Sequence, residues 1–406
     1  MVQRILIIFL LTTSLIPSMF LKGSNFRYLP AFIIVFISGM YALFSLKESK
    51  NLNHLKTYYR GNKNILLVVF LYVLMIWVSS FKTGIKENLV LISGITSVLI
   101  IMHLLFPLLI QTRKDFVFII KTLFCVCILN AIIAVSILLI NKYENIHYGI
   151  YKIGVPLSSK LEALPGIKIT VLQGIFSNPN SLGILMAFIF PAILFLIQET
   201  KSLLYRFLLI VCVLLMSFTL LHSFSRASIF STIIVLLFFL LFYFSKGFFT
   251  VAKVIMISIT LLFNLLIASG IDLNFLKNQK IIHTGRFDLW DRAIEIIQGN
   301  MLFGIGYSNT FRVLPLGYSS HNTFIEIALG SGILAMILYS IYLLLLILKI
   351  RLDKDPELSI YVLLSLLSFS VLQIFETLLF GGMSIANFYF LIVMISYLSI
   401  TSSHAT

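Results

Sequence analysis

The stretch at residues 203–244 reads "LLYRFLLIVCVLLMSFTLLHSFSRASIFSTIIVLLFFLLFYF". Two apolar runs, 203–221 and 227–244, flank the short polar turn "SFSRAS" at 223–228. A helix needs about 20 mostly apolar residues to cross the hydrocarbon core of a membrane. The stretch therefore predicts a hairpin of two membrane-spanning helices.

The composition extends this prediction to the whole chain. Of its 406 residues, 60% are hydrophobic and 11% are charged, whereas soluble domains carry about 25% charged residues. The sequence therefore predicts an all-α polytopic membrane protein. The net charge of +15 does not indicate nucleic acid, because the basic residues lie between apolar runs, where they set membrane orientation.

About twelve spans are expected, within one integral membrane domain over 1–406. The first is interpreted as a retained span, because no clear cleavage site follows it. The predicted spans are 4–21, 28–46, 64–81, 87–110, 116–140, 181–198, 203–221, 227–244, 248–269, 323–348, 358–379 and 383–401.

Lysines and arginines predict the orientation, because cytoplasmic loops carry an excess of them. They concentrate at 47–63, 113–114 and 349–354, which places both termini in the cytoplasm. The two long connections, 141–180 and 270–322, then face outward as external loops.

Four polar clusters interrupt the apolar sequence: "FSNPNS" (176–181), "SFSRAS", "GRFDLWDRAIEII" (285–297) and "SHN" (320–322). An even number of spans separates each of the first two clusters from the next, and the last two share the second long loop. We therefore expect all four on one side of the membrane.

Each cluster also has a purely structural interpretation. Pro179 ends helices, and Asn180 or Ser181 could cap the span that follows. Arg226 could extend its charge to the membrane surface, although it lies on the side where the orientation rule disfavours positive charge.

The segment 286–297 predicts a short amphipathic helix that could lie on the membrane surface, with Phe287, Trp290, Ile294 and Ile297 on one stripe. Asp288 and Arg292 are four residues apart and could pair. Arg286 has no acid at this spacing, which leaves it freer to hold an anion.

Around His321 the spacing predicts a helix start. Thr323 and Glu326 match a capping box, so Glu326 is expected to be a cap rather than a catalytic acid. His321 then lies just outside the helix with no structural task. The three cysteines fall within apolar runs, which argues against disulfides or a zinc site.

The clusters "FSNPNSLG", "SFSRAS", "GRFDLWDRAIEIIQGNMLFGIGYSNTF" and "SHNTFIEIALGSGIL", in this order, resemble the O-antigen ligase and polysaccharide polymerase family of bacterial envelope proteins. The resemblance covers roughly 176–345, and "SRA" stands where the family commonly has "SRG". It implies a GT-C-like, metal-independent, inverting glycosyltransferase without a cofactor. Such an enzyme passes an oligosaccharide from undecaprenyl diphosphate to an acceptor glycan at the outer face of the bacterial cytoplasmic membrane.

The residues suit this chemistry. Arginine binds diphosphate well, and the resemblance gives this task to Arg226 and Arg286, with Arg292 as a weaker candidate. His321 would be the general base, because imidazole titrates near neutral pH. Asn178, Asn180 and Asn322 are further candidates for substrate binding. No DxD motif occurs in the outward loops, in agreement with catalysis without metal.

Polymerase and ligase both remain open. A flippase for lipid-linked sugar is disfavoured, because its spans would be expected to carry charged residues along a central path. Assembly proteins of the polysaccharide pathway are potential partners.

Overall fold

In the computed structural model the chain is an all-α membrane protein, as predicted. The structure describes residues 49–139, 171–176, 178–270, 286–314, 319–353, 355–378 and 385–403, the short strands 146–148 and 151–153, and residues 4, 37, 40, 41, 44 and 45. Eight helices among these residues are long and apolar enough to cross a membrane, and α16 and α18 contain shorter apolar stretches.

The first half of the described chain forms α4 (Ser49–Gly61), α5 (Lys63–Thr83), α6 (Ile85–Ile100), α7 (Arg113–Leu139), α8 (Pro179–Glu199) and α9 (Leu203–His222). A π-helical turn, η2 (Ile101–Leu105), and a 3-10 turn, η3 (Phe106–Leu108), continue α6. Between α7 and α8, strands β1 (Ile146–Tyr148) and β2 (Tyr151–Ile153) form an antiparallel pair.

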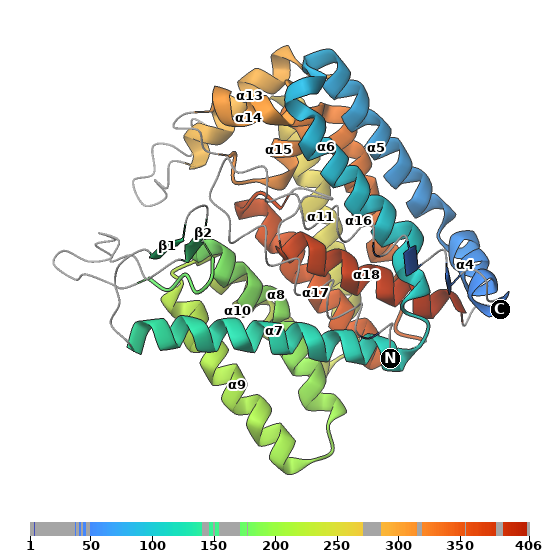
Figure 1. Ribbon diagram of the computed structural model, residues 1–406, viewed down its shortest axis with the longest axis vertical. Coiled ribbons are helices and arrows are strands. Elements are labelled where there is room, and N and C mark those ends of the chain that lie inside the picture. Colours follow the sequence, from blue (N-terminus) through green and yellow to red (C-terminus); the bar gives the residue numbers. More distant parts are fainter. Residues whose placement is uncertain are drawn as a thin grey trace.

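The second half forms α10 (Arg226–Phe244), α11 (Phe248–Ser269), α13 (Arg286–Gly299), α14 (Tyr307–Val313), α15 (Thr323–Ser331), α16 (Ile333–Lys349), α17 (Pro356–Phe375) and α18 (Ile385–Ser403). Helices α13, α14 and α15 lie at one end of the bundle, and α4 lies against α18 at the other end (Figure 1).

Ten of the predicted spans correspond to helices of the structure. The expected spans 4–21 and 28–46 lie outside the described residues except for single positions, so the total of twelve stays a prediction. The predicted external loop 141–180 also lies mostly outside them, whereas the loop 270–322 contains α13, as expected, and the additional helix α14.

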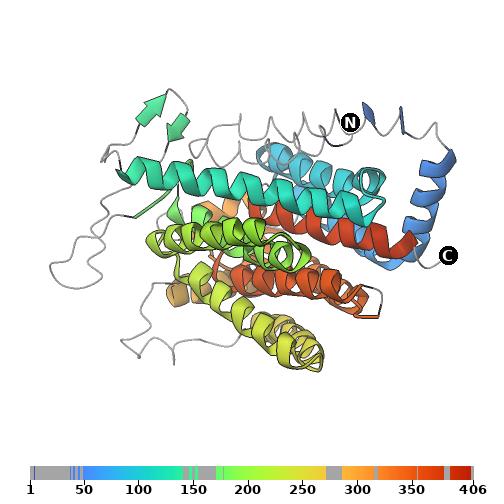
Figure 2. The same cartoon turned by 90° about the horizontal axis from the view of Figure 1, so that it is seen from below.

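Burial separates central helices from peripheral ones. The most apolar stretches of α8 and α17 are 78% and 83% buried inside the protein, compared with 22% for α9 and α11. Figure 2, seen from below, shows the teal helix α7 running alongside the red helix α18. Because the exposed surfaces of α9 and α11 are apolar, lipid is the medium that suits them.

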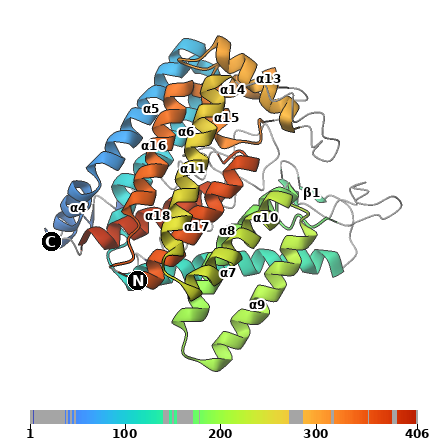
Figure 3. The same cartoon turned by 180° about the vertical axis from the view of Figure 1, so that it is seen from behind.

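Helices α10 and α17 pack closely through small polar side chains. The hydroxyls of Ser231 and Ser368 lie 2.9 Å apart across this contact. Small residues let the backbones of two membrane helices approach each other closely, and their hydroxyl groups can form hydrogen bonds between the helices. Helices α11, α16 and α17 lie side by side on the other face of the bundle (Figure 3).

The predicted span 323–348 is wrong in one respect, because it is two helices broken at Gly332. Gly332 has a φ of +89°, and a Cβ there would lie 2.2 Å from the carbonyl oxygen of Leu302. The segment 301–306 runs alongside the break: Ile305 N and Gly306 N donate to the carbonyls of Leu329 and Gly330. These bonds matter because unpaired backbone groups are costly at membrane depth.

Gly332→Ala tests this break. The side chain would require a strained backbone and would collide with Leu302, so we expect destabilisation by ~3 kcal/mol or more and loss of folded protein. Thermal unfolding and size-exclusion profiles in detergent measure the effect. Gly299→Ala is the matched control, because a Cβ there meets nothing within 4 Å. Equal stability of both variants would contradict the broken helix.

Candidate functional site

The carboxylate of Glu376 is the centre of a polar cluster at the end of α17. Its Oε1 accepts hydrogen bonds from Arg286 Nη2 and Asn180 Nδ2, both at 3.0 Å, and its Oε2 lies 3.3 Å from His321 Nδ1. The side chain is only 9% exposed. A buried carboxylate is costly without such partners. The three contacts therefore explain how Glu376 can be buried at the end of α17.

Glu376 occupies this place because α17 ends earlier than the sequence indicated. The predicted span ran to residue 379, but the helix ends at Phe375, and Glu376 already has an extended backbone as the residue after its last turn. Thr323, at the start of α15, holds the segment that follows α17. Its hydroxyl donates to Glu376 O at 3.1 Å and accepts from Leu378 N at 2.8 Å.

His321 has a positive φ of 52°, a conformation that only a few per cent of residues other than glycine adopt. The contacts of the preceding residue, Ser320, hold it there. Ser320 donates from its backbone nitrogen and its hydroxyl to Glu326 Oε2 at 2.9 and 2.8 Å, and its carbonyl accepts from Trp290 Nε1 at 2.8 Å. A backbone strain of about 1–3 kcal/mol persists only when such contacts fix it.

The predicted capping box is wrong in its residues. Asn322 is the N-cap of α15, since its Oδ1 accepts from Ile325 N at 3.0 Å, while its Nδ2 donates to Ile374 O. Thr323 is the first helical residue, and Glu326 reaches back to Ser320. Glu326 is therefore structural, as expected, but through another contact.

Arg286 is not unpaired, contrary to the sequence interpretation. Its Nη1 donates to Phe375 O at 2.6 Å and its Nη2 to Glu376, and its side chain is 25% exposed. The partner lies 90 residues further along the chain, so local spacing could not reveal it. Nη1 and Nη2 each make one of these bonds, and among the described residues no acceptor takes the remaining guanidinium donors, which are available to an anion.

Helix α13 carries Arg286 to this position because its apolar stripe is buried. Trp290, Ile294 and Ile297 are buried as the periodicity predicted, and the Trp290 ring lies 6.3 Å from that of Phe263 in α11. The stripe therefore packs against the protein.

Arg292 projects from a different face of α13. Its side chain is 52% exposed and pairs with Glu295 at 2.6 Å, an acid that the sequence interpretation did not consider. The structure does not bring Arg292 into contact with Glu376 among the described residues, and its role in diphosphate binding stays a prediction.

Asn178, rather than Asn180 or Ser181, caps α8. Its side chain accepts from Asn180 N at 2.8 Å, and Pro179 takes the first helical position. Proline suits that position because the missing N–H is not needed there. This arrangement leaves the amide of Asn180 available to Glu376.

Arg226 is the first residue of α10 and is exposed. Phe230, one turn further on, packs against Phe375 with the ring centroids 6.3 Å apart. Residues four apart share a helix face, so Arg226 lies on the face that meets the end of α17. Within the part of the chain that the structure describes, no acid pairs with Arg226.

Three of the four polar clusters contact one carboxylate, because Asn180, Arg286 and His321 all reach Glu376. That all four clusters lie on one side of the membrane stays a prediction. The sequence interpretation missed Glu376 itself. A signal was present, because a single acid within the predicted span 358–379 is a charge at membrane depth, and such charges are usually functional.

Fold and cluster together define a multi-pass membrane protein with a histidine, a carboxylate and arginines at one end. A family model described as O-Antigen ligase matches residues 210–340. Over these residues the chain is similar to that family, which supports the resemblance to the O-antigen ligase and polymerase family, whose members are glycosyltransferase-like enzymes. A search of curated proteins and a search of solved structures gave no match.

The pair of Glu376 and Arg286 can be tested by its coupling. Glu376→Gln and Arg286→Gln should each destabilise the protein, and the double variant should lose less than the sum, because each single change leaves the other, mostly buried charge without this ion pair. A coupling of about 1–3 kcal/mol is expected from unfolding in detergent. The matched cycle with Glu295→Gln and Arg292→Gln should give a smaller value, since both side chains are exposed. Equal couplings would contradict the central role of Glu376.

Proposed function

We propose that this protein is a polysaccharide polymerase. It transfers oligosaccharide repeat units from undecaprenyl diphosphate to a growing glycan at the outer face of the bacterial cytoplasmic membrane. The observation that supports it best is the contact of His321 with Glu376 beside Arg286, because His321 and Arg286 lie within the domain that matches the ligase family.

His321 is the proposed general base. When Nδ1 carries a proton it donates to Glu376, and Nε2 then holds the lone pair that can accept a proton. The same division of tasks operates in serine hydrolases, where a carboxylate fixes the histidine tautomer and stabilises the imidazolium. Glu376 thus acts as the positioning residue for His321.

The proposed reaction is a single displacement. The acceptor hydroxyl gives its proton to His321 Nε2 while its oxygen forms a bond to the anomeric carbon. The bond from that carbon to the diphosphate oxygen breaks on the opposite side, and undecaprenyl diphosphate leaves with the electron pair. Attack opposite the leaving group inverts the configuration at the anomeric carbon.

The leaving diphosphate needs positive charge, because cations placed where negative charge develops supply a large part of catalysis. We assign this task first to Arg226, which no acid of the described chain neutralises, and second to Arg286, whose charge Glu376 partly balances. Arginine can take it without a metal ion. Asn180, which contacts Glu376, is the candidate for a sugar contact. Asn322 is fully buried and both of its amide atoms bond within the protein, which favours a structural task for it.

We also propose that the end with His321 faces outward and that both termini are cytoplasmic. The excess of lysine and arginine at 47–63, 113–114 and 349–354 supports this orientation. Arg113, one of the basic residues that predict the cytoplasmic side, pairs with Glu199 and Asp355 at the end of the bundle opposite to Glu376. This position agrees with an outward-facing His321.

An assay of glycan transfer from lipid-linked donor separates these roles. His321→Ala should lower kcat by about 100-fold to 10,000-fold because the base is lost, with donor binding retained. Arg226→Lys should instead raise the donor KM, because lysine cannot bind diphosphate bidentately. Glu376→Gln should lower kcat with the donor KM retained, since His321 loses the carboxylate that orients its ring.

Matched controls come from the opposite end of the bundle. His54→Ala in α4 and Arg206→Lys in α9 change the same residue types far from the cluster and should leave kcat and KM near the wild-type values. Wild-type kinetics in His321→Ala or Arg226→Lys would disprove the assigned role.

A ligase that transfers the glycan to lipid A core or another acceptor is the alternative function, since the family match covers both activities. Deletion in the native host distinguishes them through the glycan that remains. A polymerase deletion should leave single repeat units, because elongation is lost. Long chains retained on the carrier lipid would identify a ligase instead. Unchanged glycan would contradict both.

A further inference from the structure

Gly183 in α8 is a point of close approach between α8 and the turn 223–226, which joins α9 to α10. A Cβ at this position would lie 2.5 Å from the Cβ of Ser225 and 2.7 Å from the hydroxyl oxygen of Ser223. Both distances are too short for non-bonded atoms, whose optimal separation is about 3.5–4.0 Å between carbons. Only a residue without a side chain therefore lets this turn lie directly on α8.

The turn that lies on Gly183 is strained and is held from a second side. Phe224 has a φ of +51°, a backbone conformation that is costly for a residue other than glycine. Leu172 N donates to His222 O at 2.8 Å, just before the turn. Strain of this kind persists only where surrounding contacts fix it, so the conformation of the turn depends on its contacts with Leu172 and Gly183.

Arg226 follows this turn as the first residue of α10. The helix behind it is anchored on α17, where the rings of Phe230 and Phe375 pack with their centroids 6.3 Å apart. Helix α8 is anchored as well, since 78% of its most apolar stretch is buried. A collision between α8 and the turn would therefore be relieved mainly within 223–226, and it would displace the side chain of Arg226.

The same end of α8 also contacts the Glu376 cluster. The amide of Asn180 donates to Glu376 Oε1 at 3.0 Å. Residues three apart are neighbours on the surface of a helix, so Asn180 and Gly183 lie on the same side of α8. About one turn of α8 thus contacts Glu376 through Asn180 and holds the turn before Arg226 through Gly183.

We propose that Gly183 is a positioning residue for the diphosphate of the lipid-linked donor. It holds the turn 223–226 so that the guanidinium of Arg226 reaches the same donor as the cluster of Glu376 and His321. The inference rests on the proposed function of Arg226. The missing side chain is the feature that acts, because bidentate binding of a phosphate requires a fixed arginine geometry.

Kinetics of glycan transfer and binding of undecaprenyl diphosphate to the full-length protein in detergent test this role. Gly183→Ala should raise the donor KM and the Kd for undecaprenyl diphosphate by about tenfold to a hundredfold, because Arg226 is displaced. The kcat of the folded protein should change far less, since His321 keeps its place beside Glu376. A loss of folded protein alone would lower the active fraction and leave KM and Kd unchanged.

The residue opposite to Gly183 offers a rescue. Ser225→Gly removes the Cβ that a side chain at position 183 would meet, and the Ser223 hydroxyl can rotate away. Gly183→Ala/Ser225→Gly should therefore recover the KM and Kd of Ser225→Gly alone, even if Gly183→Ala by itself yields little folded protein. Gly247→Ala is the matched control and should behave as the wild type, because a Cβ there meets only Ser245 Oγ, at 3.4 Å.

Wild-type KM and Kd in Gly183→Ala, or no recovery in the double variant, would overturn the proposal. Arg226→Lys, measured alongside, separates this result from a failure of the proposed function. If Arg226→Lys weakens binding of undecaprenyl diphosphate and Gly183→Ala does not, the positioning role alone is wrong. If neither variant weakens binding, Arg226 does not hold the diphosphate, and the role of Gly183 is wrong with it.

Discussion

The buried carboxylate of Glu376 is the interaction on which the candidate site depends. It draws Asn180 from α8, Arg286 from α13 and His321 from the loop before α15 to a single point. In a weakly polar environment an uncompensated carboxylate is costly, so each partner contributes to stability as well as to the geometry of the site. The burial of α17 between neighbouring helices fixes the place of the acid, and residues from three polar clusters contact it there.

The backbone around this point is irregular for a related reason. His321 and Phe224 both have a positive φ without being glycine, and each lies within three residues of a helix that carries site residues. The helix breaks at Gly332, between α15 and α16. Backbone nitrogens of the segment 301–306 donate to the carbonyls of Leu329 and Gly330, which the break leaves without a helical partner. Irregular backbone at membrane depth is tolerated where protein surrounds it, and here it lets a short helix present Asn322 and His321 to the end of α17.

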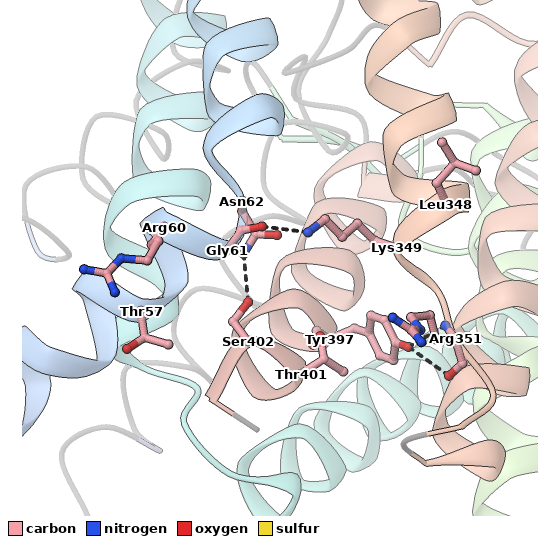
Figure 4. A pocket seen from close by; sticks show the side chains of 10 residues that line it. All are labelled: Thr57, Arg60, Gly61, Asn62, Leu348, Lys349, Arg351, Tyr397, Thr401 and Ser402. Carbon is pink, nitrogen blue, oxygen red and sulfur yellow. Dashed lines mark hydrogen bonds between the residues drawn. The ribbon is translucent and has the colours of Figure 1, made fainter. Parts of the chain in front are cut away.

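The two ends of the bundle use basic residues differently. At the end with His321, one of the two arginines is held by an acid, and His321 contacts the same carboxylate. At the other end, Arg113 joins α7, α8 and α17 through Glu199 and Asp355, while Arg60, Lys349 and Arg351 line a cavity between the ends of α4, α16 and α18 (Figure 4). At the first end the arginine and the histidine share one buried carboxylate, whereas at the second end the lysine and arginines of the cavity have no acid among its described lining residues.

The sequence by itself determined the all-α membrane class, the approximate positions of the ten described spans, the amphipathic stripe of 286–297 and the four polar clusters, because hydropathy and helical periodicity are local properties. It did not reveal the break at Gly332, the capping role of Asn178 and Asn322, or the pairing of Arg286. Those depend on contacts between residues far apart in the chain. The role of Glu376 was decided by tertiary structure alone: whether α17 ends at Phe375 or continues depends on Thr323, Arg286 and Asn180, and none of these is its neighbour in sequence.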